Sequence, residues 1–82
     1  MKGEEKTKRF TRGRSVMKIS INGKSGEYSG LPVLGELLRS LGVDPQKVAV
    51  ERNLKVVPRS LMECEPVEAG DEFEIIRLVG GG

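Results

Sequence analysis

The chain of 82 residues contains no histidine and no tryptophan, and it has a single cysteine, Cys64. Without histidine it lacks the side chain that most often acts as a general base near neutral pH. One cysteine cannot form a disulfide within the chain and cannot hold a metal ion alone, so we expect neither a disulfide nor a metal site. These absences leave few residues for catalysis and predict that side-chain packing stabilises the fold.

Long apolar segments are also missing. No stretch approaches the roughly 20 consecutive apolar residues of a membrane span, and the basic N-terminus lacks the apolar centre of a secretory signal. A chain of this length has room for one domain with a modest core. We therefore expect a single soluble, cytoplasmic domain with no membrane partner.

Charge is distributed unevenly along the chain. Residues 1–16 hold six lysines and arginines and two glutamates, whereas the remaining residues hold eight basic and ten acidic side chains. Segments that are rich in charge and poor in apolar residues cannot offset the entropy of ordering, so we expect residues 1–16 to be a disordered extension. A basic extension can contact nucleic-acid phosphates. We favour the simpler interpretation of an added terminal segment, and nucleic acid is not an expected partner.

The apolar pattern becomes regular at Met17. Apolar and polar residues alternate over residues 17–22, MKISIN, which predicts a half-buried strand. The pair Asn22-Gly23 tolerates the positive φ of a tight turn, and a short return strand is expected to begin at Glu27-Tyr28. This segment therefore predicts a β-hairpin.

An amphipathic helix is expected next. Pro32 suits the first helical turn, and Gly42 is typical of a helix end. The apolar residues between them recur with helical spacing: Val33, Leu34, Leu37, Leu38 and Leu41. A helix with one apolar face requires a sheet to cover.

The second half of the chain predicts the rest of that sheet. Residues 48–50, VAV, are interpreted as a central strand, and residues 51–53, ERN, as a turn. A brief strand follows and ends before Pro58, which cannot donate a ladder hydrogen bond. Residues 60–65 predict an irregular helical turn with Leu61 and Met62 packed inward. Residues 73–79 predict the longest strand.

This order of elements indicates an α+β domain with one main helix packed on one face of a mixed sheet of four to five strands. The order suits the β-grasp arrangement. We place the domain at residues 17–79 and a flexible glycine tail at residues 80–82.

Three motifs make a family resemblance specific. Val57-Pro58-Arg59, Gly70-Asp71 and the ending Val79-Gly80-Gly81-Gly82 resemble the ThiS family of ubiquitin-like, β-grasp sulfur carriers, which act in thiamin biosynthesis and end in Gly-Gly. The resemblance covers residues 17–82. The ERN segment stands where many relatives have an Asn-Gly-like turn, a departure that concerns the local turn and not the chemistry. The basic extension is not part of the usual family pattern.

The resemblance implies a chemical purpose for the terminal glycines. It implies that a ThiF-like enzyme uses ATP to adenylate the carboxylate of Gly82, and that persulfide sulfur, supplied indirectly by a cysteine desulfurase or another donor, displaces AMP. The thiocarboxylate then donates sulfur to a ThiG-like thiazole synthase. Gly82 is thus expected to be modified to a glycyl adenylate and to 1-thioglycine, with no cofactor bound by this chain. Gly80 and Gly81 lack a Cβ and can thread through a narrow channel at almost any φ and ψ.

Recognition by a partner is expected to use the last strand, whose apolar residues occupy both faces. Ubiquitin-like tails place the parity of Phe73 and Ile75 in the core, which implies that Ile76 and Leu78 are exposed. Exposed apolar clusters often mark partner surfaces. Ile76 and Leu78 are therefore the predicted partner-binding patch.

Other reactive groups are weaker candidates. Cys64 lies between Glu63 and Glu65, whose charges oppose thiolate formation, and we expect an ordinary buried or half-buried side chain. Glu72 and Glu74 share a strand face and are interpreted as solvated side chains, not as an acid–base pair. The GGG ending is not followed by a helix or a lysine, so it is no phosphate-binding loop. We therefore expect a protein co-substrate and not an enzyme.

Two alternatives remain. The small subunit of molybdopterin synthase, a MoaD-like protein, and other ubiquitin-like carriers use the same C-terminal chemistry, although the motif at Val57-Pro58-Arg59 favours ThiS. A non-catalytic β-grasp binding module with a nucleic-acid-contacting basic extension belongs to a different class, and blocking Gly82 would leave its activity unchanged.

Overall fold

The computed structural model of the protein describes residues 16–78. The expected glycine tail and all of the expected basic extension except Val16 lie outside the described residues. The elements are, in chain order, β2 (Met17–Ile21), β3 (Lys24–Tyr28), α1 (Leu34–Ser40), the 3-10 turn η1 (Pro45–Lys47), β4 (Val48–Arg52), β5 (Lys55–Val56), the 3-10 turn η2 (Arg59–Leu61) and β6 (Glu72–Arg77).

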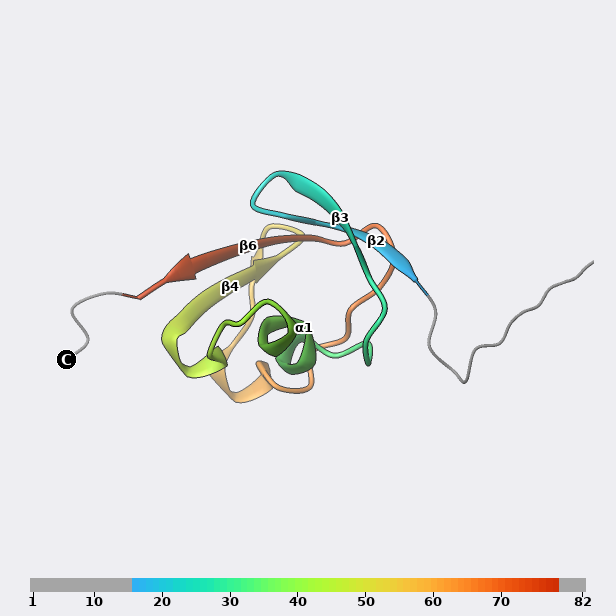
Figure 1. Cartoon of the computed structure of the whole chain (residues 1–82). Helices are drawn as coiled ribbons and strands as arrows, with labels where there is room; N and C mark the ends of the chain where they lie inside the picture. Colours follow the sequence, from blue (N-terminus) through green and yellow to red (C-terminus); the bar gives the residue numbers. More distant parts are fainter. Residues whose placement is uncertain (1–15, 79–82) are drawn as a thin grey trace, which may run out of the picture.

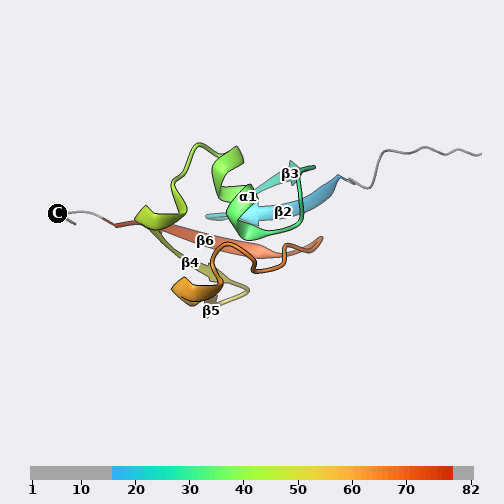
Figure 2. The same ribbon diagram turned by 90° about the horizontal axis from the view of Figure 1, so that it is seen from below.

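The five strands form one mixed sheet in the order β3-β2-β6-β4-β5; Figure 1 shows the first four of these strands, and Figure 2 shows β5 beside β4. Strand β6 pairs in parallel with β2 and antiparallel with β4. Helix α1 lies on one side of this sheet, and the turned view agrees (Figure 2). The predicted α+β class with one main helix is confirmed. Strand β4 is internal as expected, but the middle of the sheet is β6.

The first hairpin turns at Asn22 and Gly23, whose φ values are 51° and 83°. Both central residues therefore have the positive φ that a two-residue hairpin turn requires, as the Asn-Gly pair predicted. The return strand begins at Lys24, not at Glu27, because all five residues after the turn pair with β2. Tyr28 ends this strand and is buried, with 6% of its surface exposed.

Helix α1 is shorter at its start than Pro32 suggested. Val33 is the N-cap with extended backbone angles, so Pro32 precedes the helix. A bridge between Val33 and Pro66, and the hydrogen bond from the Leu34 N–H to the Glu65 carbonyl at 2.8 Å, keep the chain extended up to Val33. Gly42 follows the C-cap with a φ of 76°, the left-handed conformation that commonly ends helices.

The turn between β4 and β5 differs from the expected one. Glu51 and Arg52 belong to β4, and the turn consists of Asn53 and Leu54, with φ values of 52° and 72°. Leu54 thus occupies a left-handed position that is costly for a residue with a Cβ, and its side chain is 84% exposed. The brief strand before Pro58 is confirmed as β5.

The segment before β6 contains the predicted helical turn, as η2. Met62 packs inward with 3% exposure, but Leu61 is 44% exposed, so the prediction was wrong for Leu61. Successive side chains of a 3-10 turn point roughly 120° apart, and two neighbours cannot both face the core.

The core lies between α1 and the sheet. Its buried residues come from the helix, from four strands and from the connections on the helix side: Ile19, Tyr28, Leu34, Leu37, Leu38, Val48, Val50, Val57, Met62, Val67 and Phe73. Phe73, the second residue of β6, is 1% exposed and anchors the start of this strand in the core. The core therefore fixes the strand that leads to the C-terminus.

Candidate functional site at the end of the central strand

Strand β6, with six residues the longest strand in the described part of the chain, carries the C-terminal segment. Five of its residues pair with β4, from Phe73 opposite Arg52 to Arg77 opposite Val48. Beyond the strand, the Leu78 N–H donates to the Lys47 carbonyl at 3.0 Å. The sheet therefore holds the chain up to Leu78. Val79 and the three glycines predicted to be the reactive tail, Gly80, Gly81 and Gly82, lie outside the described residues.

The side chain of Asn22 fixes the middle of β6. The Ile75 N–H donates to Asn22 Oδ1 at 2.8 Å, and Asn22 Nδ2 donates to the Ile75 carbonyl at 3.3 Å. The Asn22 backbone N–H also donates to the Phe73 carbonyl at 2.8 Å. The pairing of β2 with β6 ends at Ile21 and Phe73. Asn22 thus extends the hydrogen bonding along β6 beyond that point.

A polar network around Asp71 fixes the start of β6. Asp71 is 5% exposed and accepts three hydrogen bonds: from Arg52 Nε at 2.8 Å, from Asn53 Nδ2 at 2.9 Å and from the Glu68 N–H at 2.8 Å. Asn53 Oδ1 in turn accepts from the Glu72 N–H at 2.9 Å. These bonds join the β4–β5 turn to the first residues of β6.

The electrostatics of this network favour the ionised carboxylate. Burial alone would raise the pKa of Asp71, but the hydrogen bonds from Arg52, Asn53 and the Glu68 N–H outweigh it and hold the pKa below its ordinary value. The hydrogen bond to Asp71 is also the main cause that raises the pKa of Arg52. Arg52 makes further ion pairs with Glu65 at 3.2 Å and Glu68 at 3.4 Å.

Arg59 supports the other end of the site. Its guanidinium donates to the Pro45 carbonyl at 2.6 Å and to the Val48 carbonyl at 2.8 Å. It therefore bridges the chain on both sides of Lys47, the residue that binds the Leu78 N–H. The motif Val57-Pro58-Arg59 thus contains a positioning residue for the strand end.

The face of β6 turned away from α1 carries the predicted patch. Ile76 is 54% exposed and Leu78 is 49% exposed, so the predicted exposure of both side chains is confirmed. Phe73 is buried and Ile75 packs against the core, as expected for the alternate residues of β6 that face the helix. The role of Ile76 and Leu78 in partner binding stays a prediction.

The other candidate groups offer little chemistry. Cys64 is exposed, so the expectation of a buried or half-buried side chain was wrong. It follows η2 in the connection to β6, where Met62 points into the core and the next two residues point outward. Glu72 and Glu74 are exposed, as expected. Within residues 16–78 no group of histidine, cysteine, aspartate and glutamate side chains could hold a metal ion.

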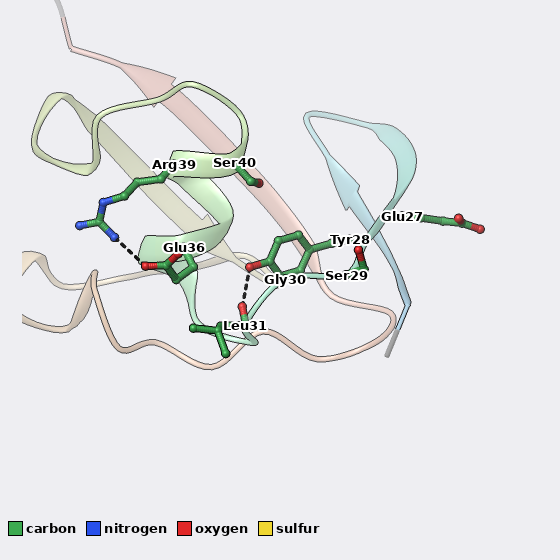
Figure 3. A pocket seen from close by; sticks show the side chains of 8 residues that line it. All are labelled: Glu27, Tyr28, Ser29, Gly30, Leu31, Glu36, Arg39 and Ser40. Atoms are coloured by element: carbon green, nitrogen blue, oxygen red, sulfur yellow. Dashed lines mark hydrogen bonds and ion pairs between the residues drawn. The ribbon is translucent and has the colours of Figure 1, made fainter. Parts of the chain in front are cut away.

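A hollow lies between the end of β3 and α1 (Figure 3). Three of its polar side chains bond to neighbouring protein groups: the Tyr28 hydroxyl donates to the Leu31 carbonyl at 2.5 Å, and Arg39 pairs with Glu36 at 3.4 Å (Figure 3). Tyr28 pairs with Met17 at the start of β2, and β2 runs parallel to β6. The hollow therefore lies at the opposite end of the sheet from Leu78.

The sequence could not reveal most positioning residues. Asn22 was noted only as a turn former, and Arg52 was assigned to a turn. The motifs Gly70-Asp71 and Val57-Pro58-Arg59 had been singled out, and each contributes a positioning side chain.

No helix in the described part of the chain is both long and apolar enough to span a membrane.

A mixed five-stranded sheet with one helix, whose central strand leads directly to a C-terminal run of glycines, defines a ubiquitin-like β-grasp protein. The model of the ThiS family matches residues 19–82, and the chain belongs to the ThiS family. The resemblance found in the sequence is thereby confirmed.

Solved structures and curated relatives agree with this family assignment. The thiamine biosynthesis protein ThiS from Geobacter metallireducens has a crystal structure that covers 80% of this chain and 100% of its own, with a TM-score of 0.67 and 34% identity. The β-grasp assignment is therefore confirmed. A thiazole synthase from Paramagnetospirillum magneticum is 47% identical over 66 residues, and one from Magnetococcus marinus is 39% identical over 66 residues. An uncharacterized protein, ycf40, from Pyropia yezoensis is 35% identical over 68 residues, which are 83% of this chain and 96% of that protein.

The two thiazole synthases are much longer than the matching segment. Each match covers 80% of this chain and 20% of the relative, so the chain spans one fifth of the length of these proteins. The similarity thus concerns a ThiS-like segment and not the whole of a thiazole synthase.

Proposed function

We propose that this chain is a sulfur carrier protein whose Gly82 carboxylate is adenylated and then converted to a thiocarboxylate that supplies sulfur for the thiazole moiety of thiamin. The observation that carries the proposal is the family match, which extends through the last glycine. In this function the chain is a protein co-substrate, and a ThiF-like adenylyltransferase supplies the ATP site.

The chemistry balances in three steps. An oxygen of the Gly82 carboxylate attacks the α-phosphorus of ATP, and pyrophosphate leaves. A persulfide sulfur then attacks the acyl carbon, and AMP leaves. A second thiol attacks the resulting acyl disulfide at the sulfur remote from the acyl group, so that a disulfide forms on the donor and the thiocarboxylate remains on Gly82.

The described geometry supports this function through the strand that precedes the tail. Hydrogen bonds to Asn22 and Lys47 tie β6 and Leu78 to the rest of the sheet. A rigid base reduces the number of positions that the reacting carbon can occupy when an enzyme encloses the glycines, and precise placement accounts for a large part of catalytic rates. The exposed Ile76 and Leu78 lie directly before the tail and are the proposed contact with the enzyme.

Similarity to two thiazole synthases favours the thiamin branch over molybdopterin synthesis. A segment that resembles this chain is part of the same polypeptide as those enzymes. We therefore propose a ThiG-like thiazole synthase as the acceptor of the sulfur, and a persulfide-forming enzyme as its indirect source. The cytoplasm, which contains ATP and reduced thiols, suits these steps.

The acceptor can be tested with sulfur isotopes. The protein is loaded with heavy sulfur at Gly82 and offered in parallel to the cognate thiazole synthase and to a molybdopterin synthase large subunit. We expect the label to enter the thiazole and to stay on the carrier with the second enzyme. Label transfer to the molybdopterin precursor alone would replace the thiamin assignment with the MoaD-like alternative.

A further inference from the structure

The chain has two asparagines, Asn22 and Asn53, and each lies in a hairpin turn. Their backbone conformations are nearly the same, with φ values of 51° and 52°. Each side chain also exchanges hydrogen bonds that reach the backbone of β6. The two sites differ in the residue that follows, which is Gly23 after the first asparagine and Leu54 after the second.

An asparagine that precedes glycine can react with the next backbone nitrogen. The Gly23 nitrogen attacks Asn22 Cγ, the Cγ–Nδ2 bond breaks, and the NH2 group leaves as ammonia with the proton of the Gly23 N–H. Water then opens the resulting cyclic imide. Cleavage at Cγ gives aspartate, and cleavage at the main-chain carbonyl carbon gives isoaspartate, which has one additional methylene in the main chain. Glycine favours the attack because it has no Cβ to hinder the approach and restricts the backbone least.

The structure leaves the first turn open to this reaction. Asn22 and Gly23 are both exposed, so water reaches them. A Cβ placed on Gly23 would meet no atom of a non-neighbouring residue within 4 Å, and within residues 16–78 the Gly23 N–H donates no hydrogen bond. The Asn22 amide group is held by two exposed bonds to Ile75, and it becomes free to react when these bonds open.

We propose that Asn22 is a site of spontaneous deamidation, and that its conversion to aspartate or isoaspartate releases the middle of β6 from the first hairpin. The chain supplies the nucleophile and water is the co-reactant, so the reaction requires no enzyme. The site is separate from Gly82, and the inference does not depend on the proposed function. Because β6 leads to the C-terminal segment, the modification loosens the base of that segment as the protein ages.

The release follows from the position of Asn22 in the sheet. The ladder between β2 and β6 ends at Ile21 and Phe73, and beyond it, among the described residues, Asn22 alone bonds the Ile75 N–H and carbonyl on this side. In the aspartate product an oxygen replaces Nδ2 and faces the Ile75 carbonyl, so a hydrogen bond becomes a repulsion. In the isoaspartate product the additional methylene also changes the turn, and both bonds are lost.

Peptide mass spectrometry of aged protein tests the site. The full chain is incubated at mildly alkaline pH, which favours removal of the Gly23 N–H proton, both folded and in guanidinium chloride. In the folded protein we expect Asn22 to gain the mass difference between an acid and an amide and to give two isomers that chromatography separates. Asn53 is the internal control and should remain an amide. Unfolding should accelerate the conversion of Asn22, because the bonds to Ile75 no longer hold its side chain.

Amide hydrogen exchange, followed by NMR, measures the effect on β6. The aged protein is separated by its additional negative charge and compared with fresh protein and with the variant Asn22→Asp. In the isoaspartate form the Ile75 amide should exchange on the order of tenfold faster, the change that the loss of one hydrogen bond produces. Asn22→Asp keeps an acceptor for the Ile75 N–H and should show a smaller increase. The Glu72 amide should be unchanged, because Asn53 still binds it.

Each part of the inference has its own contradicting result. An unchanged Asn22 in the folded chain, or equal conversion of Asn22 and Asn53, would overturn the deamidation site. Conversion that leaves the Ile75 amide as slow as in fresh protein would overturn the release of β6. Exchange that accelerates equally at Ile75 and Glu72 would indicate general destabilisation and would also overturn a local release. Failure of sulfur transfer to Gly82 would leave these results unaffected.

Discussion

Replacing Asp71 by asparagine converts one oxygen of a buried carboxylate into an NH2 group at the start of β6. In the wild type both oxygens only accept: Oδ2 accepts from Arg52 and from the Glu68 N–H, and Oδ1 accepts from Asn53. With its oxygen toward Arg52, the new amide must point its NH2 group at the NH2 group of Asn53. Rotation of the Asn53 amide would relieve this contact but break its bond with the Glu72 N–H.

The cost follows from these contacts. The variant retains two of the three accepted hydrogen bonds and leaves a donor unpaired at a site where the wild-type side chain is 7% exposed. An unsatisfied buried polar group costs about 1–3 kcal/mol, and more when a charged partner is involved. Arg52 keeps Glu65 and Glu68, so its charge remains compensated. We expect Asp71→Asn to lower the free energy of unfolding by about 2 kcal/mol, which lowers the melting temperature of a domain of this size by roughly 8–16 °C.

The same network predicts a dependence on pH. The pKa of Asp71 in the folded protein lies below its value in the unfolded chain, so the unfolded chain binds the proton more strongly. The contribution of Asp71 to stability is therefore complete above the ordinary aspartate pKa of about 4, and it decreases as the pH falls through the lower folded pKa. Asp71→Asn should lose less stability than the wild type in that acidic range.

Urea unfolding followed by far-ultraviolet circular dichroism measures both effects. Glu68→Gln is the control: it removes a carboxylate from the same arginine, but this side chain is 72% exposed, so the change should be below about 0.5 kcal/mol. A stabilising role of the Asp71 carboxylate would be refuted if Asp71→Asn were as stable as Glu68→Gln at neutral pH, or if it lost stability toward acid as steeply as the wild type.

Three further predictions concern exposed residues. Ile76→Arg should weaken binding to the adenylating enzyme and change the free energy of unfolding by no more than about 0.5 kcal/mol, because Ile76 is 54% exposed; a large fall in melting temperature would place Ile76 in the core. Cys64→Ser should retain sulfur transfer, since the proposed acceptor is the terminal carboxylate; a folded but inactive variant in a mass-spectrometric transfer assay would contradict this. Leu54→Gly should raise the free energy of unfolding by about 1 kcal/mol, because glycine tolerates the φ of 72° at this turn; unchanged or lower stability in urea would oppose the strain argument.

Local patterns predicted most of the fold because each depends on neighbouring residues. Alternation identified β2, the leucine spacing identified α1, and Asn22-Gly23 identified the first turn. The second turn was misplaced because Leu54 is not a usual turn residue. Its positive φ closes the β4–β5 hairpin, while Arg52 extends β4 and reaches Asp71, 19 residues away in sequence. A pairing at that distance has no local signal.

The candidate site was predicted less completely. Parity on β6, together with the family resemblance, identified Ile76 as exposed, since one face of the strand has to meet the helix. The opposition of Glu51 and Glu74 could not be recognised, because the register that places them opposite each other is a property of the folded sheet. The exposure of Cys64 was missed because it depends on how the chain leaves η2, and no residue pattern reports this.

The mass of the C-terminal peptide tests most directly whether Gly82 accepts the sulfur. The protein is incubated with ATP, the cognate ThiF-like enzyme and a persulfide donor, beside a variant with one residue appended after Gly82 and the variant Gly81→Val. The wild type should gain the mass difference between sulfur and oxygen at Gly82. Both variants should stay folded and gain nothing, because a displacement of about 1 Å can lower the rate roughly a hundredfold and a β-branched side chain fills a channel sized for backbone. Sulfur on the extended variant, or sulfur mapped to Cys64, would contradict the account.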